Sequence, residues 1–94
     1  MEAELVVNRP RLLLAGGKRI CLVRTADRLL AVDDTCTHNG ESLSKGQVNF
    51  LGEVVCPWHG NRFNLVTGRE SGERSADLET YPVRIDSEGV YVAV

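Results

Sequence analysis

The sequence predicts an all-β protein that is built from short strands. Apolar and polar residues alternate with a period of two in several short stretches, and turn-forming residues separate these stretches at short intervals. No window of about 11 residues or more keeps a helical period with capping residues at both ends. These observations favour hairpins and meanders over helices.

The expected strands are short segments rich in Val, Leu and Ile. In chain order they are residues 12–14, 19–24, 28–33, 47–50, 53–55, 62–65, 81–86 and 90–94. Turn signals separate them, at Gly16-Gly17, Thr25-Ala26-Asp27, Leu51-Gly52, Thr67-Gly68 and Ser87-Glu88-Gly89. The first three strands form a meander and the last two form a hairpin.

Two of the hairpin signals are strong, and one further strand is weakly indicated. Gly16-Gly17 lies between two apolar runs, and both glycines accept the positive φ of a tight hairpin turn. Apolar residues alternate clearly over 81–86 before the chain returns. An edge strand over 5–7 is limited by Pro10, because proline cannot donate to a ladder. Residues 35–45 and 71–77 mix glycine with polar residues and are expected to be functional or mobile loops.

Composition indicates one small folded domain over residues 1–94. The chain is 43 % apolar and 26 % charged, and its aromatic content is 5 %. A core this thin often needs a disulfide or a metal for stability. Eleven basic and thirteen acidic side chains give a formal net charge of -2, without the basic surplus of a nucleic-acid binder. We therefore expect no nucleic-acid partner.

The cysteines and the apolar runs indicate the compartment. Cys21, Cys36 and Cys56 are an odd number of thiols, which disfavours a secreted scaffold of intramolecular disulfides. No apolar run approaches the roughly 18 residues of a membrane span, and the start of the chain lacks the features of a signal peptide. We expect a cytoplasmic protein without a membrane segment, stabilised by a metal centre.

Both histidines of the chain lie close to a cysteine. The first motif is Cys36-Thr37-His38 and the second, after seventeen intervening residues, is Cys56-Pro57-Trp58-His59. Structural zinc sites usually pair Cys with Cys and His with His in their short spacings. One Cys and one His in each motif instead suits a binuclear iron centre, in which one iron takes two thiolates and the other takes two imidazoles. A structural zinc module that serves only an interaction is the alternative from another class.

The pattern Cys-x-His, followed at this distance by Cys-x-x-His, resembles the signature of Rieske 2Fe-2S proteins. The resemblance covers residues 20–94. Other residues that fall where Rieske ferredoxins commonly show them are Gly40, Leu43, Gly46, Pro57, Gly60, Phe63, Thr67 and Gly68. It implies an antiparallel β-sandwich with a cluster-binding subdomain, over about 34–65, that is formed by two ligand loops.

The resemblance also implies the cofactor and its ligands. One 2Fe-2S cluster of the Rieske type is expected, with Cys36 and Cys56 at the iron that stays ferric. His38 and His59 are then the ligands of the iron that accepts the electron. Neutral imidazoles in place of two thiolates raise the reduction potential above that of an all-cysteine cluster.

Departures from the family pattern imply a reduction potential that is low for a Rieske cluster. High-potential Rieske proteins carry a disulfide between the ligand loops, but Glu41 and Trp58 stand at the corresponding positions. Those proteins also place Ser and Tyr hydroxyl donors after the second motif, where this chain has Asn61 and Phe63. Fewer donors to the cluster imply a value toward the low end of the range of about -150 to +300 mV. The pattern resembles the ferredoxins of aromatic-ring dioxygenase systems.

The function that the resemblance implies is one-electron transfer by a soluble carrier that is not itself an enzyme. The expected partners are a flavin-dependent NAD(P)H reductase, which donates the electron, and a terminal oxygenase, which receives it. Contacts are expected to be transient, at the cluster tip, through the exposed edges of His38 and His59, and the carrier is expected to be a monomer. A small subunit of an assimilatory nitrite reductase is the second candidate.

Other residues carry plainer expectations. Cys21 alternates within its strand and is expected to be an inert core thiol. Trp58 either packs over the cluster or forms a docking surface. Several acidic residues near the tip are expected to form a solvated face, with partner steering as the alternative; they are Asp33, Asp34, Glu41, Glu70 and Glu73.

Overall fold

Short antiparallel strands make up most of the regular structure in the computed structural model, which describes residues 7–26, 28–37, 40–58, 60–73, 75–87 and 89–93. The strands are β1 (Arg11–Ala15), β2 (Lys18–Arg24), β3 (Leu29–Asp33), β4 (Gln47–Val48), β5 (Glu53–Val55), β6 (Arg62–Asn64), β7 (Thr80–Tyr81), β8 (Val83–Asp86) and β9 (Gly89–Val92). A 3-10 turn, η2 (Leu43–Lys45), follows the first ligand motif. The predicted all-β class is confirmed, and in the described ranges no helix is long and apolar enough to span a membrane.

The larger sheet forms the base of the molecule. Its strand order is β1-β2-β3-β7, and the pairs are antiparallel. Gly16 and Gly17 have φ values of 57° and 78°, as the tight turn between β1 and β2 requires. The predicted meander is therefore confirmed. Of the weaker edge strand over 5–7, Val7 forms an isolated bridge with Arg24, and the rest lies outside the described residues.

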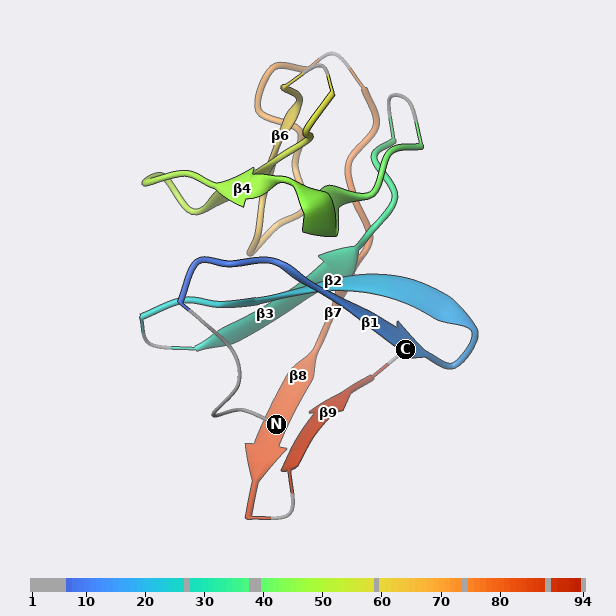
Figure 1. Ribbon diagram of the computed structural model, residues 1–94, viewed down its shortest axis with the longest axis vertical. Coiled ribbons are helices and arrows are strands. Elements are labelled where there is room, and N and C mark those ends of the chain that lie inside the picture. The colour runs from blue at the N-terminus through green and yellow to red at the C-terminus, as the bar shows by residue number, and fades with distance from the viewer. Residues whose placement is uncertain are drawn as a thin grey trace.

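The predicted strand over 81–86 is divided at Pro82. β7 pairs with β3 through Ala31 and Tyr81, whereas β8 pairs with β9 in a separate two-stranded sheet. Proline has no N–H to donate, so it stands where the chain leaves one sheet and enters the other. Figure 1 shows the β8–β9 hairpin continuing away from the base sheet, at the end opposite the small upper sheet.

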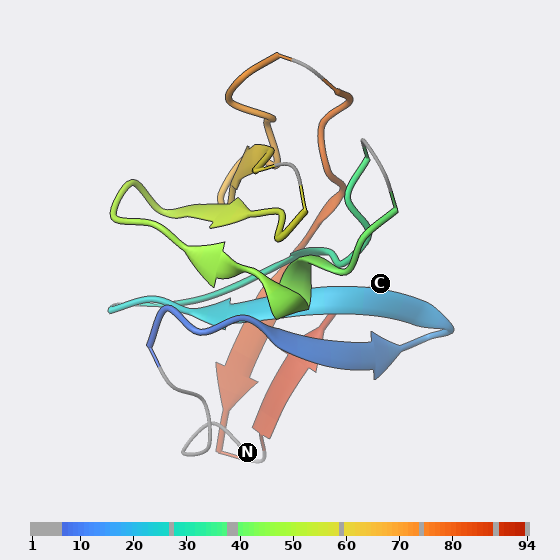
Figure 2. The ribbon, with the colours of Figure 1, turned by 45° about the horizontal axis from the view of Figure 1, so that its top comes forward.

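A three-stranded sheet of order β4-β5-β6 lies above the base sheet (Figures 1 and 2). β4 is shorter than the predicted 47–50 because the chain turns at Asn49. The side-chain Oδ1 of Asn49 accepts hydrogen bonds from the backbone N–H groups of Leu51 and Glu53, both at 3.0 Å. This turn closes the β4–β5 hairpin and places β5 directly before the second ligand motif.

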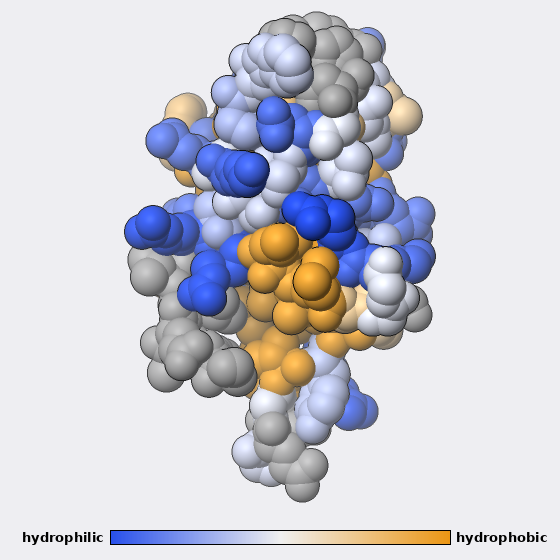
Figure 3. Space-filling view, turned by 45° about the vertical axis from the view of Figure 1, so that its right-hand side comes forward, coloured by the Kyte–Doolittle hydropathy of each residue, from blue (hydrophilic) through white to orange (hydrophobic). Residues whose placement is uncertain are grey.

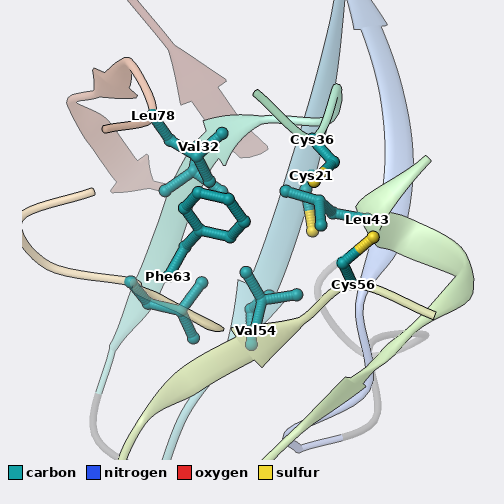
Figure 4. Close-up of a cluster of buried hydrophobic side chains, with 10 residues drawn as sticks. Cys21, Val32, Cys36, Leu43, Val54, Cys56, Phe63 and Leu78 are labelled. Carbon is teal, nitrogen blue, oxygen red and sulfur yellow. The ribbon is translucent and has the colours of Figure 1, made fainter. Parts of the chain in front are cut away.

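The main core lies between the two sheets. Phe63 from β6, Val54 from β5 and Leu43 from η2 are fully buried in it, together with Val32 and other apolar side chains (Figure 4). β2 is buried on both faces, because Ile20 and Leu22 enter a second cluster on the other side of the base sheet. Figure 3 shows apolar residues gathered on the lower part of one face, below a mostly hydrophilic upper part.

Candidate metal centre

The first ligand motif forms a tight loop directly after the base sheet. The N–H of Cys36 donates to the carbonyl of Glu41 at 2.9 Å, and the N–H of Gly40 donates to the carbonyl of Cys36 at 2.8 Å. Gly40 has a φ of 77°, a conformation that an L-residue adopts only with strain. The glycine therefore closes the loop four residues after its cysteine.

The second ligand motif repeats this loop after β5. The N–H of Cys56 donates to the carbonyl of Asn61 at 2.8 Å, and the N–H of Gly60 donates to the carbonyl of Cys56 at 3.1 Å. Gly60 has a φ of 76°. Two segments twenty residues apart in the sequence thus adopt the same hydrogen-bonded turn, and each holds a cysteine at its base. The shared glycine, four residues after each cysteine, is a sequence signal for this match that the motif spacing alone does not reveal.

The structure brings the two predicted cysteines into one buried region. Cys36 and Cys56 are each 2 % exposed and both belong to the main core cluster. Figure 4 shows them on the side of that cluster where Leu43 lies, away from the ring of Phe63. Neither Cys36 nor Cys56 forms a disulfide in the part of the chain that the structure describes. Two buried thiols at the bases of matching loops fit the thiolate half of a 2Fe-2S site, because thiolates are the usual ligands of such iron.

The two predicted histidine ligands, His38 and His59, lie outside the described residues. Among the residues that are described, no group of three or more His, Cys, Asp or Glu side chains is placed to hold a metal ion. The structure therefore describes the two cysteines of the predicted site, and the assignment of all four residues as ligands stays a prediction.

A buried carboxylate supports the first ligand loop, although no local pattern in the sequence marks it as buried. Asp34 is fully buried two residues before Cys36. Its Oδ1 accepts a hydrogen bond from the N–H of Ser44 at 2.7 Å, and its Oδ2 accepts one from the Ser42 hydroxyl. The guanidinium Nη2 of Arg19 lies 3.5 Å from the same Oδ2. Hydrogen bonds to a charged acceptor are the stronger kind. Asp34 thus fastens the η2 turn to the strand end that leads into the first loop.

A second buried carboxylate supports the other sheet. Glu53 in β5 is 7 % exposed and accepts hydrogen bonds from the Ser71 hydroxyl and, at 2.8 Å, from Asn49 Nδ2. The hydrogen bond from Ser71 contributes most to lowering the pKa of Glu53 below its usual value, and the bond from Asn49 comes next. This carboxylate joins the β4–β5 turn to the segment after β6.

The expectation of an acidic solvated face at the tip is wrong in part. Asp34 and Glu70 are buried, at 0 % and 1 % exposure, so neither belongs to a surface field. Trp58, within the second ligand loop, is 64 % exposed, which favours the docking surface over the packing role. Burial is the main reason that the pKa of Cys21 is raised to about 12, with the nearby Asp34 charge as the second cause. Cys21 is thus the inert core thiol that was predicted.

The comparison with known families decides what kind of site this is. Residues 2–82 match the model of the Rieske [2Fe-2S] domain. The chain belongs to the Rieske [2Fe-2S] family. Its cofactor is accordingly one 2Fe-2S cluster of the Rieske type, as the ligand motifs predicted.

Similar Rieske proteins are ferredoxin components of dioxygenase systems. Ferredoxin CarAc of Metapseudomonas resinovorans is 38 % identical over 80 residues, which make up 83 % of this chain and 73 % of that protein. The ferredoxin component of the 2,4-dinitrotoluene dioxygenase system of Burkholderia sp. (strain RASC) is 37 % identical over 68 residues, or 71 % of this chain and 64 % of that protein. The predicted role of electron carrier rather than enzyme is confirmed by these relatives.

Solved Rieske structures share the fold. The ferredoxin of carbazole 1,9a-dioxygenase from Nocardioides aromaticivorans IC177 superposes with a TM-score of 0.90 at 26 % identity, over 97 % of this chain and 89 % of that one. A chain in the complex of reduced oxygenase and oxidized ferredoxin in carbazole 1,9a-dioxygenase superposes with a TM-score of 0.86 at 30 % identity. The match covers 97 % of this chain and 94 % of that one. A nitrite reductase small subunit from Mycobacterium tuberculosis superposes with a TM-score of 0.84 at 26 % identity. The match covers 98 % of this chain and 90 % of that one.

Two residues that follow the second Rieske motif were predicted to matter for the potential. Phe63 is fully buried in the core and offers no hydrogen-bond donor. Asn61 is fully buried as well, and its Nδ2 donates to Ser75 Oγ at 3.1 Å. The amide of Asn61 therefore holds another segment of the chain, a contact that no local pattern in the sequence predicts.

Proposed function

We propose that this chain is a Rieske ferredoxin that passes single electrons to a terminal oxygenase, with Cys36, His38, Cys56 and His59 as the cluster ligands. The observation that carries the proposal is the pair of matching loops, each with a buried cysteine at its base. A histidine follows each cysteine within three residues, inside the same loop. The four proposed donors thus come from two short segments whose cysteines lie in one buried cluster.

The chain's own groups set the environment of the electron. When bound, the cluster supplies a one-electron couple whose centre, with two thiolates and two neutral imidazoles, is neutral when oxidised and carries one negative charge when reduced. Burial of Cys36 and Cys56 keeps water from the thiolate side. Phe63 supplies no hydroxyl donor, so we expect a potential near the low end of the Rieske range.

The partners follow from the relatives and from the exposed tip. Relatives at 37 and 38 % identity are ferredoxin components, and a chain of similar fold is found in a complex of oxygenase and ferredoxin. Trp58 is exposed within the second ligand loop, which supports this loop as the docking site of an oxygenase. We propose a flavin-dependent NAD(P)H reductase as the electron donor and transient contacts at the tip with both partners.

The remaining features of the proposal concern the molecule as a whole. We propose that residues 1–94 form a single Rieske domain, with its cluster-binding subdomain over about 34–65, and that it acts as a monomer. The odd number of thiols supports a reducing compartment such as the cytoplasm. A nitrite reductase small subunit is the second candidate, favoured by the similar fold of such a subunit.

Spectroscopy of anaerobically purified protein tests the ligand assignment. We expect a brown protein whose reduced form gives a Rieske-type electron paramagnetic resonance (EPR) signal; a colourless protein that holds one zinc would contradict the proposal. His59→Cys should lower the reduction potential, because a thiolate adds a negative charge beside the redox-active iron. Cys21→Ser, which changes a buried thiol outside the motifs, should leave both the signal and the potential unchanged. An unchanged potential in His59→Cys would refute the role of His59.

The electron acceptor is tested by reconstitution. Reduced protein mixed with a ring-hydroxylating oxygenase or with the large subunit of a nitrite reductase should be oxidised quickly by the former and slowly by the latter. The reverse order of rates would favour the second candidate.

A further inference from the structure

The segment that follows β6 crosses over the site. We call residues 69–73 and 75–77 the covering segment. Figure 2 shows it, in orange, arching above the two ligand loops. Its ends are closed by backbone hydrogen bonds: the N–H of Ser71 donates to the carbonyl of Arg62 at 2.7 Å, and the N–H of Leu78 donates to that of Gly68 at 2.7 Å. The ends of the covering segment are therefore fixed to β6 and to the turn after it.

One side chain near the middle of the covering segment reaches both ligand loops. Ser75 Oγ lies 3.1 Å from Thr37 Oγ1, in the first loop, and accepts a hydrogen bond from Asn61 Nδ2, at the end of the second, also at 3.1 Å. Thr37 Oγ1 also donates to the carbonyl of Ala76 at 2.5 Å. Thr37 directly precedes His38, and Asn61 follows His59 by two residues. These contacts join three segments that are distant in the sequence.

We propose that Ser75 is a positioning residue for the metal centre. Its hydroxyl fastens the covering segment to both ligand loops and so limits how often water and chelators reach the cluster. The inference rests on the proposed function, because it assumes that Cys36, His38, Cys56 and His59 hold the cluster. It goes beyond that assignment by giving a role to a residue outside the ligand motifs.

The expected size of the effect follows from the two contacts. Each ordinary hydrogen bond that is made only in the closed form shifts the equilibrium between closed and open forms roughly two- to tenfold. Ser75→Ala removes one contact of Thr37 and one contact of Asn61, so the open form of the covering segment should be about tenfold more populated. Loss of iron to a chelator should accelerate by about the same factor when it proceeds through the open form.

The reduction potential gives a second readout, which a merely structural role would not move. The reduced centre carries one negative charge and the oxidised centre carries none, so access of water favours the reduced form. Ser75→Ala should therefore raise the potential. A tenfold change in the equilibrium between the two forms corresponds to 59 mV for one electron, and the expected shift lies below that value.

The experiment uses the purified holoprotein. Iron loss to excess bathophenanthroline is followed by visible absorbance, and the potential is measured by voltammetry, for wild type, Ser75→Ala, Ser75→Thr and Thr37→Val. Ser87→Ala, an exposed serine in the β8–β9 turn, is the matched control. Ser75→Ala should lose iron about tenfold faster than wild type, Thr37→Val should also lose it faster, and Ser75→Thr, which keeps the hydroxyl, should lie closer to wild type than Ser75→Ala.

The outcomes distinguish a failure of the role of Ser75 from a failure of the ligand assignment. Wild-type rates and potential in Ser75→Ala overturn the role of Ser75, and they leave the ligand assignment standing if the wild type shows a Rieske signal. If Ser75→Ala cannot be obtained folded, Thr37→Val decides, and a wild-type rate in that variant overturns the proposal. A wild type without a Rieske signal instead overturns the proposed function itself.

Discussion

A methyl group added at Gly46 should push the two ligand loops apart. Gly46 follows η2 and lies against the end of β5, where a Cβ would stand 2.0 Å from the carbonyl oxygen of Val55. Real Cβ atoms essentially never approach closer than 3.0 Å, so the two backbones must separate by at least 1.0 Å. Val55 directly precedes Cys56, and η2 is fastened through Asp34 to the strand end before Cys36. The displacement therefore acts on the two segments that lead into Cys36 and Cys56.

The magnitude of the Gly46→Ala effect follows from this contact. Overpacking a close contact destabilises a protein by about 1–3 kcal/mol, and for a domain of this size each kcal/mol lowers the melting temperature by about 4–8 °C. Gly46 has a φ of -91°, outside the left-handed region, so the effect comes from the contact. We expect the variant to melt about 5–20 °C below wild type and to show an altered EPR spectrum and faster loss of the cluster.

Gly17→Ala is the matched control for this prediction. Gly17 lies in the β1–β2 turn with a φ of 78°, and a Cβ there meets nothing within 4 Å. The substitution should cost about 1–2 kcal/mol through backbone strain alone and leave the EPR spectrum as in wild type. Melting is followed by circular dichroism and the cluster by EPR and visible absorbance. A wild-type EPR spectrum in Gly46→Ala, or an equal spectral change in Gly17→Ala, would refute the reasoning.

Two further predictions concern ionisable groups away from the proposed ligands. Hydrogen bonds from Ser71 and then Asn49 hold the pKa of Glu53 below its usual value of 4.5, so its carboxylate stabilises the fold above that pH, and this contribution is lost as the pH falls through 4.5 toward the lower folded value. Glu53→Gln should therefore melt below wild type at pH 7, and the difference in melting temperature should narrow as the pH falls below 4.5; a constant difference would contradict the assignment. Burial raises the pKa of Cys21 to about 12, so iodoacetamide at pH 8 should leave Cys21 unlabelled in the native holoprotein and label it after unfolding. Rapid native labelling at Cys21, located by peptide mass spectrometry, would show that the thiol is accessible.

Features that depend on neighbouring residues could be predicted from the sequence. Gly16-Gly17 fixes a tight turn because both residues accept positive φ, and the first hairpin forms as expected. The spacing of Cys36 and Cys56 relative to their histidines identified the family, because few metal sites combine one thiolate and one imidazole in each arm. Each of these signals is contained within a few residues.

Features that depend on distant contacts could not be predicted. Asp34 and Glu70 are buried, although acidic residues in a loop-rich region usually indicate a solvated face. Ser75 stands 38 residues from Thr37 and 14 from Asn61, so no local pattern marks it as their partner. The change of sheet at Pro82 could be predicted only in part. The missing N–H of proline is evident from the sequence, but the partner strand of β8 is not.

The two ligand motifs differ in the spacing between cysteine and histidine, but their loops have the same backbone closure. In both loops the cysteine N–H bonds to the carbonyl five residues ahead, and a glycine four residues ahead, with a φ of 76–77°, bonds back to the cysteine carbonyl. The turn is therefore set by its backbone closure and is independent of which internal residue is the histidine. His38 follows its cysteine by two residues and His59 by three, and both spacings fit inside the same closed turn. A fixed turn holds each thiol, and under the proposed assignment each histidine would reach the second iron from its own position in the sequence of that turn.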